Sequence, residues 1–128
     1  MSLATATMSK TSLDEDTLNQ LIFAIRKFVD ERLIPLEAQV SEKDEIPTEI
    51  VQEMRELGLF GLTIPHEYGG IGLNTFVECK VVRELGRTSP AFRSICGTNN
   101  GIGSQGIVMD GTEEQRAFYL PRLASGEI

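Results

Sequence analysis

The chain has 128 residues, 41% of them hydrophobic, which suits one domain with one modest core. Its 12 basic and 19 acidic residues give a formal charge of −7 with no basic cluster, which argues against a surface for nucleic acid or an anionic membrane. No apolar run approaches the roughly 18 residues of a membrane span, and the first residues lack the pattern of a secretion signal, so we expect a soluble, cytoplasmic protein.

The first segment, MSLATATMSKTS (residues 1–12), is predicted to be a disordered leader, so we expect the folded domain to span residues 13–128. Ser12 and Glu15 have the spacing of a capping box, which predicts a helix start. We therefore expect a first amphipathic helix within residues 11–33. The apolar residues spaced along one face of it are Leu18, Leu21, Ile22, Ile25 and Val29.

Pro35 marks the end of this helix or a bend in it. The acidic stretch over residues 36–47 is only loosely helical in pattern, so we expect a connector there. Pro47 then introduces a second helix, and Gly58 follows as its carboxy-terminal stop. The apolar face of the second helix consists of Ile50, Val51, Met54 and Leu57.

The stretch LTIPHEYGGIGLN (residues 62–74) combines a proline, three glycines and the only histidine of the chain. Glycines let backbone approach a ligand and histidine moves protons near neutral pH, so an active-site loop is one interpretation and a tight connector is the other. A catalytic histidine needs a nucleophile or an orienting acid beside it, and no spacing identifies one for His66. We therefore expect His66 to be a loop or surface residue.

A third helix is predicted from a capping box formed by Thr75 and Glu78, and Gly86 closes it. The two cysteines, Cys79 and Cys96, fall in separate predicted helices with no CxxC spacing. We expect two free, buried thiols rather than a disulfide or a metal site.

A fourth helix begins at Ser89, with Pro90 in the favoured first position, and is predicted to run to about Met109 before Gly111 ends it. It contains four glycines, Gly97, Gly101, Gly103 and Gly106. Each interior helical glycine costs about 0.5–1 kcal/mol relative to alanine, or about 2–4 kcal/mol for the four together. Such a penalty indicates that something approaches the helix closely.

Two interpretations of this helix remain open at the level of sequence. Gly97 and Gly101 lie one turn apart, where they would admit a neighbouring backbone. Alternatively, Thr98, Ile102 and Gly106 recur every four residues, and this stripe of small and apolar residues would form one wall of a slot for a slim ligand.

Thr112 and Gln115 form a capping box for a fifth helix, and Pro121 is expected to kink or break it. The final LASGEI is typical of a helix stop followed by the start of another segment, so we expect the natural chain to continue beyond Ile128.

No period-2 alternation predicts a strand, so the fold is predicted to be all-α, an up-and-down orthogonal bundle of about five to six helices. The chain has no GxSxG nucleophile elbow and no P-loop. GIGSQG (residues 101–106) matches GxGxxG, but it lies inside a predicted helix rather than between a strand and a helix, which argues against dinucleotide binding.

Several stretches, in this order and at these spacings, resemble the amino-terminal helical domain of the flavin-dependent acyl-CoA dehydrogenases over residues 15–128. They are MRELGLFGLTIPHEYGGIGLN, VVRELGRTSPAF, NNGIGSQGI and GTEEQRAFYLPRLASGEI. In that family a β-barrel-like middle domain, opening with Thr-Glu-Pro, and a carboxy-terminal helical bundle follow. The resemblance also implies that PHEYGG is the connector between the second and third helices.

The resemblance implies an enzyme that oxidises acyl-CoA to 2,3-enoyl-CoA with FAD as cofactor. It also implies an electron-transfer flavoprotein as partner and a homo-oligomer as the intact state. In the family a glutamate base and the main flavin contacts lie outside the amino-terminal domain, so we expect no catalytic and no flavin-binding residue here, and the chain alone is expected to be inactive.

Carried over by residue, the resemblance places Thr98 and Ile102 at the far end of the acyl tunnel, and spacing extends that face to Gly106. These three are the predicted substrate-binding residues. The alternative function is a self-sufficient helical interaction module without enzymatic activity. Sequence beyond Ile128 that opens into Thr-Glu-Pro distinguishes the first function from the second.

Overall fold

The computed structural model describes residues 13–128, and helices account for all the regular structure of that part. No strand occurs among the described residues, which confirms the predicted all-α fold. Three short turns complete the helices: η1 (Val29–Leu33, a π-helix), η2 (Ile34–Leu36) and η3 (His66–Tyr68), the last two 3₁₀-helical. The α-helices are α2 (Glu15–Phe28), α3 (Glu37–Lys43), α4 (Thr48–Glu56), α5 (Thr75–Leu85), α6 (Pro90–Asn100), α7 (Gln105–Asp110) and α8 (Glu113–Ala124).

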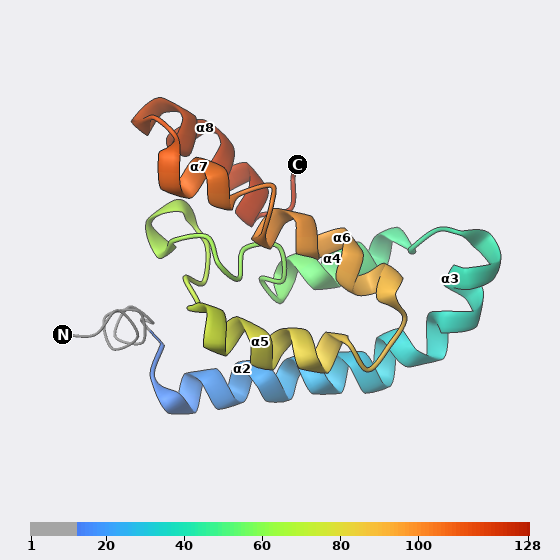
Figure 1. The fold of residues 1–128 in the computed structure, drawn as a ribbon. Coiled ribbons are helices and arrows are strands. Elements are labelled where there is room, and N and C mark those ends of the chain that lie inside the picture. The colour runs from blue at the N-terminus through green and yellow to red at the C-terminus, as the bar shows by residue number, and fades with distance from the viewer. Residues whose placement is uncertain (1–12) are drawn as a thin grey trace.

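The helices form two layers with a smaller pair at one end (Figure 1). Helices α2 and α5 lie side by side in one layer, and α4 and α6 lie over them. Helix α3 turns the chain at one end of the molecule, while α7 packs on α8 at the other. The carboxy-terminal end lies close to α6, where Asn99 donates a hydrogen bond to the carbonyl of Ile128 (Figure 1).

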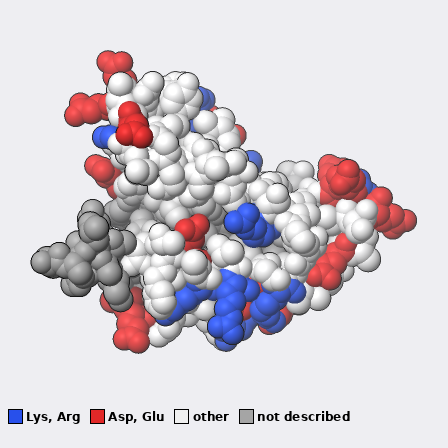
Figure 2. All heavy atoms as spheres, in the orientation of Figure 1, with Lys and Arg blue, Asp and Glu red and all other residues white. Residues whose placement is uncertain are grey.

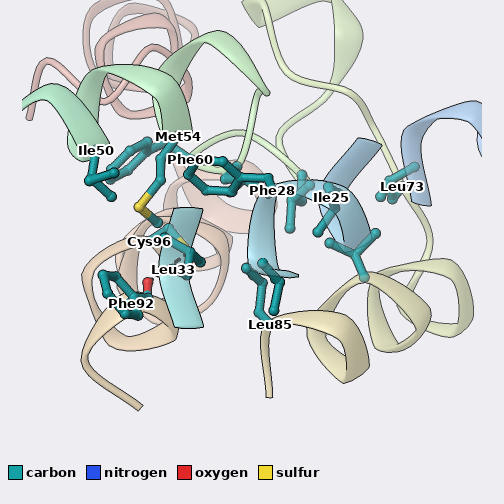
Figure 3. Packing of buried hydrophobic residues seen from close by; sticks show 14 of the residues in the cluster. Ile25, Phe28, Leu33, Ile50, Met54, Phe60, Leu73, Leu85, Phe92 and Cys96 are labelled. Carbon is teal, nitrogen blue, oxygen red and sulfur yellow. Dashed lines mark hydrogen bonds between the residues drawn. The ribbon is translucent and has the colours of Figure 1, made fainter. Parts of the chain in front are cut away.

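The main core lies between the two layers (Figure 3). Ile25 and Phe28 of α2 and Met54 of α4 belong to this core cluster, and Phe92 and Cys96 contribute to it from α6. Burial of each large side chain of this kind stabilises the fold by about 1.5–3 kcal/mol. A second, smaller cluster consists of Ile64, Leu120, Leu123 and Ala124, and it fixes α8 against the loop after α4.

Charged side chains join α2 and α5, the two helices that lie side by side in one layer. The carboxylate of Glu84 on α5 accepts hydrogen bonds from Arg26 of α2, at 2.8 Å, and from Arg87, at 3.1 Å. Arg87 also pairs with Asp30. Figure 2 shows basic side chains gathered along the α2 and α5 side of the visible face, with acidic ones mainly toward the ends.

Two predicted helix caps are wrong. Ser12 lies outside the described residues, and α2 is capped instead by Asp14, whose carboxylate accepts from the Thr17 amide at 2.7 Å. Helix α5 is capped by Asn74, whose side-chain oxygen accepts from the Val77 amide at 3.0 Å, rather than by the predicted capping box. Asp and Asn cap as well as Ser and Thr, so spacing alone did not choose between neighbouring candidates.

Several other predicted helix ends are confirmed. Ser89 caps α6 with Pro90 in the first position, and Thr112 and Gln115 form the capping box of α8. Gly86 and Gly111 cap the ends of α5 and α7. Gly58 follows α4 with φ +75°, a backbone conformation that favours glycine.

The structure corrects the expected connector over residues 36–47 and, of the kink or break expected at Pro121, the break. Residues 37–43 form α3, which one buried side chain, Val40, anchors to the core. Helix α8 continues through Pro121 to Ala124. Pro121 lies in the last turn, where its missing N–H removes one helical hydrogen bond only, and the buried Leu120 holds the helix on both sides of that loss.

Candidate functional site

The predicted fourth helix is two helices, α6 and α7, separated by a break at residues 101–104. Gly101 leaves the helical region, with φ −118° and ψ −106°. A Cβ on Gly103 would lie 2.8 Å from the carbonyl oxygen of Thr98, and the Gly103 amide donates to that same oxygen at 2.8 Å. The break therefore needs glycine at residue 103, and it replaces the continuous helix predicted from sequence.

The glycines of this segment do not admit a neighbouring backbone, which corrects that interpretation for the described residues. A Cβ on Gly97 would meet the guanidinium of Arg93, a flexible side chain of the same helix. A Cβ on Gly101 would meet only the carbonyl of Gly97, and one on Gly106 would meet nothing within 4 Å. Because two of the four glycines lie at the break, the helix-interior penalty applies only to Gly97 and Gly106.

The three predicted substrate-binding residues all lie on the outer surface of α6, the break and α7. Thr98 and Gly106 are exposed, and Ile102, at the break, is 92% exposed. Further apolar side chains are exposed on the same two helices: Ile95 on α6 is 36% exposed and Met109 on α7 is 72% exposed. We call Ile95, Thr98, Ile102, Gly106 and Met109 the α6–α7 face.

Two buried asparagines, missed in the sequence analysis, hold the end of α6 in place. The side-chain amide of Asn100 donates to the carbonyl of Leu59 at 2.6 Å and to that of Cys96 at 3.1 Å. The hydroxyl of Thr63 donates to the carbonyl of Asn100 at 2.6 Å, and Gln105 donates to that hydroxyl at 3.0 Å. This network joins α6 and α7 to the loop after α4.

Asn99 makes a separate connection. Its side-chain amide donates to the carbonyl of Leu123 at 2.9 Å and to that of Ile128 at 2.8 Å. The helix end is therefore fixed on one side to the loop after α4 and on the other to the end of α8. Consecutive asparagines at a helix end are the only sequence feature that points to these contacts.

A cavity of about 630 Å³ lies behind the break, lined by the loop at residues 63–66, the segment 72–75, Glu78, the end of α6 and Gln105. It contains none of the predicted residues Thr98, Ile102 and Gly106. Burial raises the pKa of Glu78, and the nearby Arg93 partly opposes the change. His66 is exposed at the rim of the cavity, which confirms that it is a loop or surface residue.

The cysteines are both free, as predicted, but only one is buried. Cys79 is exposed on α5, which corrects the expectation of two buried thiols, because it lies on the outer face of that helix. Burial raises the pKa of the Cys96 thiol to about 11, so this group stays protonated near neutral pH. In the described part of the chain no three His, Cys, Asp or Glu side chains gather as a metal site would require.

The sequence matches the family model described as "Acyl-CoA dehydrogenase, N-terminal domain" over residues 15–127. The chain belongs to the acyl-CoA dehydrogenase family. Within residues 13–128 of this acyl-CoA dehydrogenase domain, no helix is long and apolar enough to cross a membrane.

Individual relatives agree with this assignment. The chain is 43% identical over 124 residues to (2S)-methylsuccinyl-CoA dehydrogenase of Cereibacter sphaeroides, covering 96% of this chain and 22% of that protein. It is 31% identical over 103 residues to an acyl-CoA dehydrogenase of Bacillus subtilis, covering 80% of this chain and 27% of that protein. The chain thus spans about a quarter of the length of these relatives.

Solved structures of the family share the fold. An acyl-CoA dehydrogenase from Bacillus anthracis, complexed with FAD, superposes with a TM-score of 0.76 at 33% identity, over 89% of this chain and 20% of that one. A glutaryl-CoA dehydrogenase from Mycobacterium smegmatis, in complex with FADH2, superposes with a TM-score of 0.77 at 32% identity, over 90% and 29%.

The GxGxxG match at residues 101–106 lacks the surroundings of a dinucleotide fingerprint, as the sequence analysis predicted. The GIGSQG segment lies between two helices, α6 and α7, and no strand precedes it. A dinucleotide fingerprint requires that strand, because it aims the glycine turn and the helix N-terminus at the pyrophosphate. The GIGSQG segment is therefore not a dinucleotide-binding turn of that kind.

Proposed function

We propose that the chain is the amino-terminal domain of an FAD-dependent acyl-CoA dehydrogenase that oxidises acyl-CoA to 2,3-enoyl-CoA, and that the α6–α7 face forms a wall of its acyl pocket. The observation that carries the proposal is the position of Ile102, 92% exposed at a break that Gly101 and Gly103 make. Ile95 and Met109 are exposed on the two helices that flank this break, and a group of exposed apolar side chains is typical of a surface that another apolar group covers.

The residues of the face suit a slim hydrocarbon chain. Burial of each methylene group is worth about 0.8 kcal/mol, and Ile95, Ile102 and Met109 offer apolar surface for it. Gly106 has no side chain, and the space beside it is open. In this proposal the domain binds and orients the acyl chain and excludes water, while the reacting groups and the FAD site belong to other parts of the enzyme.

The family comparisons support FAD and suggest the first substrate to test. Two structural neighbours are solved with FAD or FADH2. The relative with 43% identity acts on (2S)-methylsuccinyl-CoA, whereas the isovaleryl, short/branched and very long-chain relatives are 31–36% identical. We therefore propose a short, branched acyl-CoA as substrate. An electron-transfer flavoprotein as acceptor, a homo-oligomeric enzyme and a cytoplasmic location complete the proposal.

Substitution of Ile102 in the complete enzyme tests the proposal. In this proposal Ile102→Phe narrows the acyl pocket, so kcat/KM should fall more for octanoyl- and palmitoyl-CoA than for butyryl-CoA or a short, branched substrate such as isovaleryl-CoA. Ile34→Phe, the same substitution at an exposed site on η2, is the matched control and should change nothing. If Ile102→Phe leaves the chain-length preference unchanged, the α6–α7 face is not part of the acyl pocket. That result favours the alternative function, a helical interaction module without enzymatic activity.

A further inference from the structure

Asn99 joins the α6–α7 face to the end of the described chain. It is nearly fully buried, at 9% exposed, although Thr98 beside it is exposed on the face. Both hydrogens of its side-chain amide are used, one on the carbonyl of Leu123 and one on that of Ile128. The partners lie 24 and 29 residues away along the chain, so the contact is tertiary and not part of helix formation.

The segment that Asn99 holds is fixed from its other side as well. After α8 the chain turns at Gly126, which has φ +76°, and a Cβ there would lie 2.9 Å from the ring of Phe60. A Cβ on Gly61 would lie 3.1 Å from Ala124, so the end of α8 rests directly on the loop after α4. The amides of residues 127 and 128 both donate to the carbonyl of Arg122. The exit segment, residues 125–128, therefore has one defined position.

We infer that Asn99 is a positioning residue, which sets the α6–α7 face relative to the chain that continues from the exit segment in the complete enzyme. The inference rests on the proposed function, in which this face and later parts of the enzyme enclose the acyl chain together. Asn99 touches neither substrate nor cofactor in this account. It acts through Thr98 and Ile102, which flank it on α6 and at the break.

Asn99 and Asn100 hold different parts of the domain. Asn100 donates to the carbonyl of Leu59 and so joins α6 to the loop after α4, a buried contact within the domain. Asn99 binds only backbone at and beyond the end of α8. Loss of the Asn99 side chain should therefore change the position of the α6–α7 face more than it changes the packing of the core.

The test uses the complete enzyme with the substitution Asn99→Asp. Aspartate has nearly the same shape as asparagine, but it lacks the side-chain amide donor and places a carboxylate against two carbonyl oxygens. We expect retained flavin and a change of about tenfold in the ratio of kcat/KM for butyryl-CoA and octanoyl-CoA, mainly through KM. Val81→Ala is the stability control, because Val81 is buried in the α5 layer away from the exit segment. It should lower the melting temperature and leave the substrate ratio unchanged.

A second variant keeps the test decisive if Asn99→Asp does not fold. Gly126→Ala strains the exit segment from the opposite side, against Phe60, and should change the substrate ratio in the same way. The inference is overturned if the folded variants of Asn99 and Gly126 keep the wild-type ratio while Ile102→Phe changes it. If Ile102→Phe also leaves the ratio unchanged, the proposed function itself fails.

Discussion

The carboxylate of Glu84 on α5 accepts a hydrogen bond from the guanidinium of Arg26 on α2, across 2.8 Å. The hydrogen bond from Arg26 is the main reason that the pKa of Glu84 lies below its ordinary value of 4.5, and Arg87 lowers it further. The side chain of Glu84 is only 9% exposed, whereas that of Arg26 is 54% exposed. The contact therefore joins α2 and α5 at the edge of the core.

Removal of the Glu84 charge should weaken the fold in a pH-dependent way. A group with a lowered pKa stabilises the folded state above its ordinary pKa, and this contribution is lost as the pH falls through the folded value. Glu84→Gln should lower the free energy of unfolding by about 1–2 kcal/mol at neutral pH, after allowance for the exposed arginine. In urea unfolding the difference from wild type should shrink as the pH falls below 4.5. Glu45→Gln, at an exposed position, is the control; a difference independent of pH contradicts the assignment.

Two glycines of the candidate site should respond oppositely to the same substitution. Gly103→Ala places a Cβ against the carbonyl of Thr98 and should destabilise the chain, since backbone cannot move aside cheaply. Gly106→Ala adds a methyl group in open space within α7 and should stabilise it by up to about 1 kcal/mol. Thermal unfolding of the pair measures both effects. Equal losses of stability at the two sites would show that the break is not where we place it.

The hydroxyl of Ser104 should be dispensable for stability. It is fully buried, and among the described residues it has no hydrogen-bond partner. An unsatisfied buried hydroxyl costs about 1–3 kcal/mol, so Ser104→Ala should be neutral or stabilising in urea unfolding. Thr63→Val, which removes a hydroxyl with two hydrogen-bonded neighbours, is the contrasting variant and should destabilise. A clear loss of stability in Ser104→Ala argues for a partner that binds this hydroxyl.

The two cysteines should differ in reactivity toward a thiol reagent. Cys79 is exposed and should react at neutral pH in the folded protein. Cys96 is buried, and its pKa of about 11 leaves almost no thiolate, so it should react only after unfolding. Counting modified thiols by mass spectrometry before and after denaturant checks this. Modification of Cys96 in the native state contradicts the packing of α6.

Local rules predicted most of the helices but not the site geometry. Ser89, Pro90 and the Thr112–Gln115 box mark helix starts because a cap depends on residues within one turn. The break at Gly101 was missed, because apolar spacing continues through it and glycine is compatible with either a helix or a turn.

Tertiary contacts explain the other features of the structure that the sequence did not predict. Asn99 and Asn100 bind carbonyls 24 and 41 residues away, and no local pattern contains that information. Val40 anchors α3 through the core rather than through a repeated apolar face. Spacing offered Thr98 and Ile102 as one of two open interpretations, the family resemblance then chose them, and the structure places both on an exposed surface.

The most direct measurement is a structure of the complete enzyme with a bound acyl-CoA. The account predicts carbon atoms of the acyl chain within about 4 Å of Ile102, the distance of an apolar contact, and alongside Thr98. An acyl chain that lies elsewhere, with Ile102 still open to solvent or covered only by protein, would contradict the assignment of the α6–α7 face to the acyl pocket.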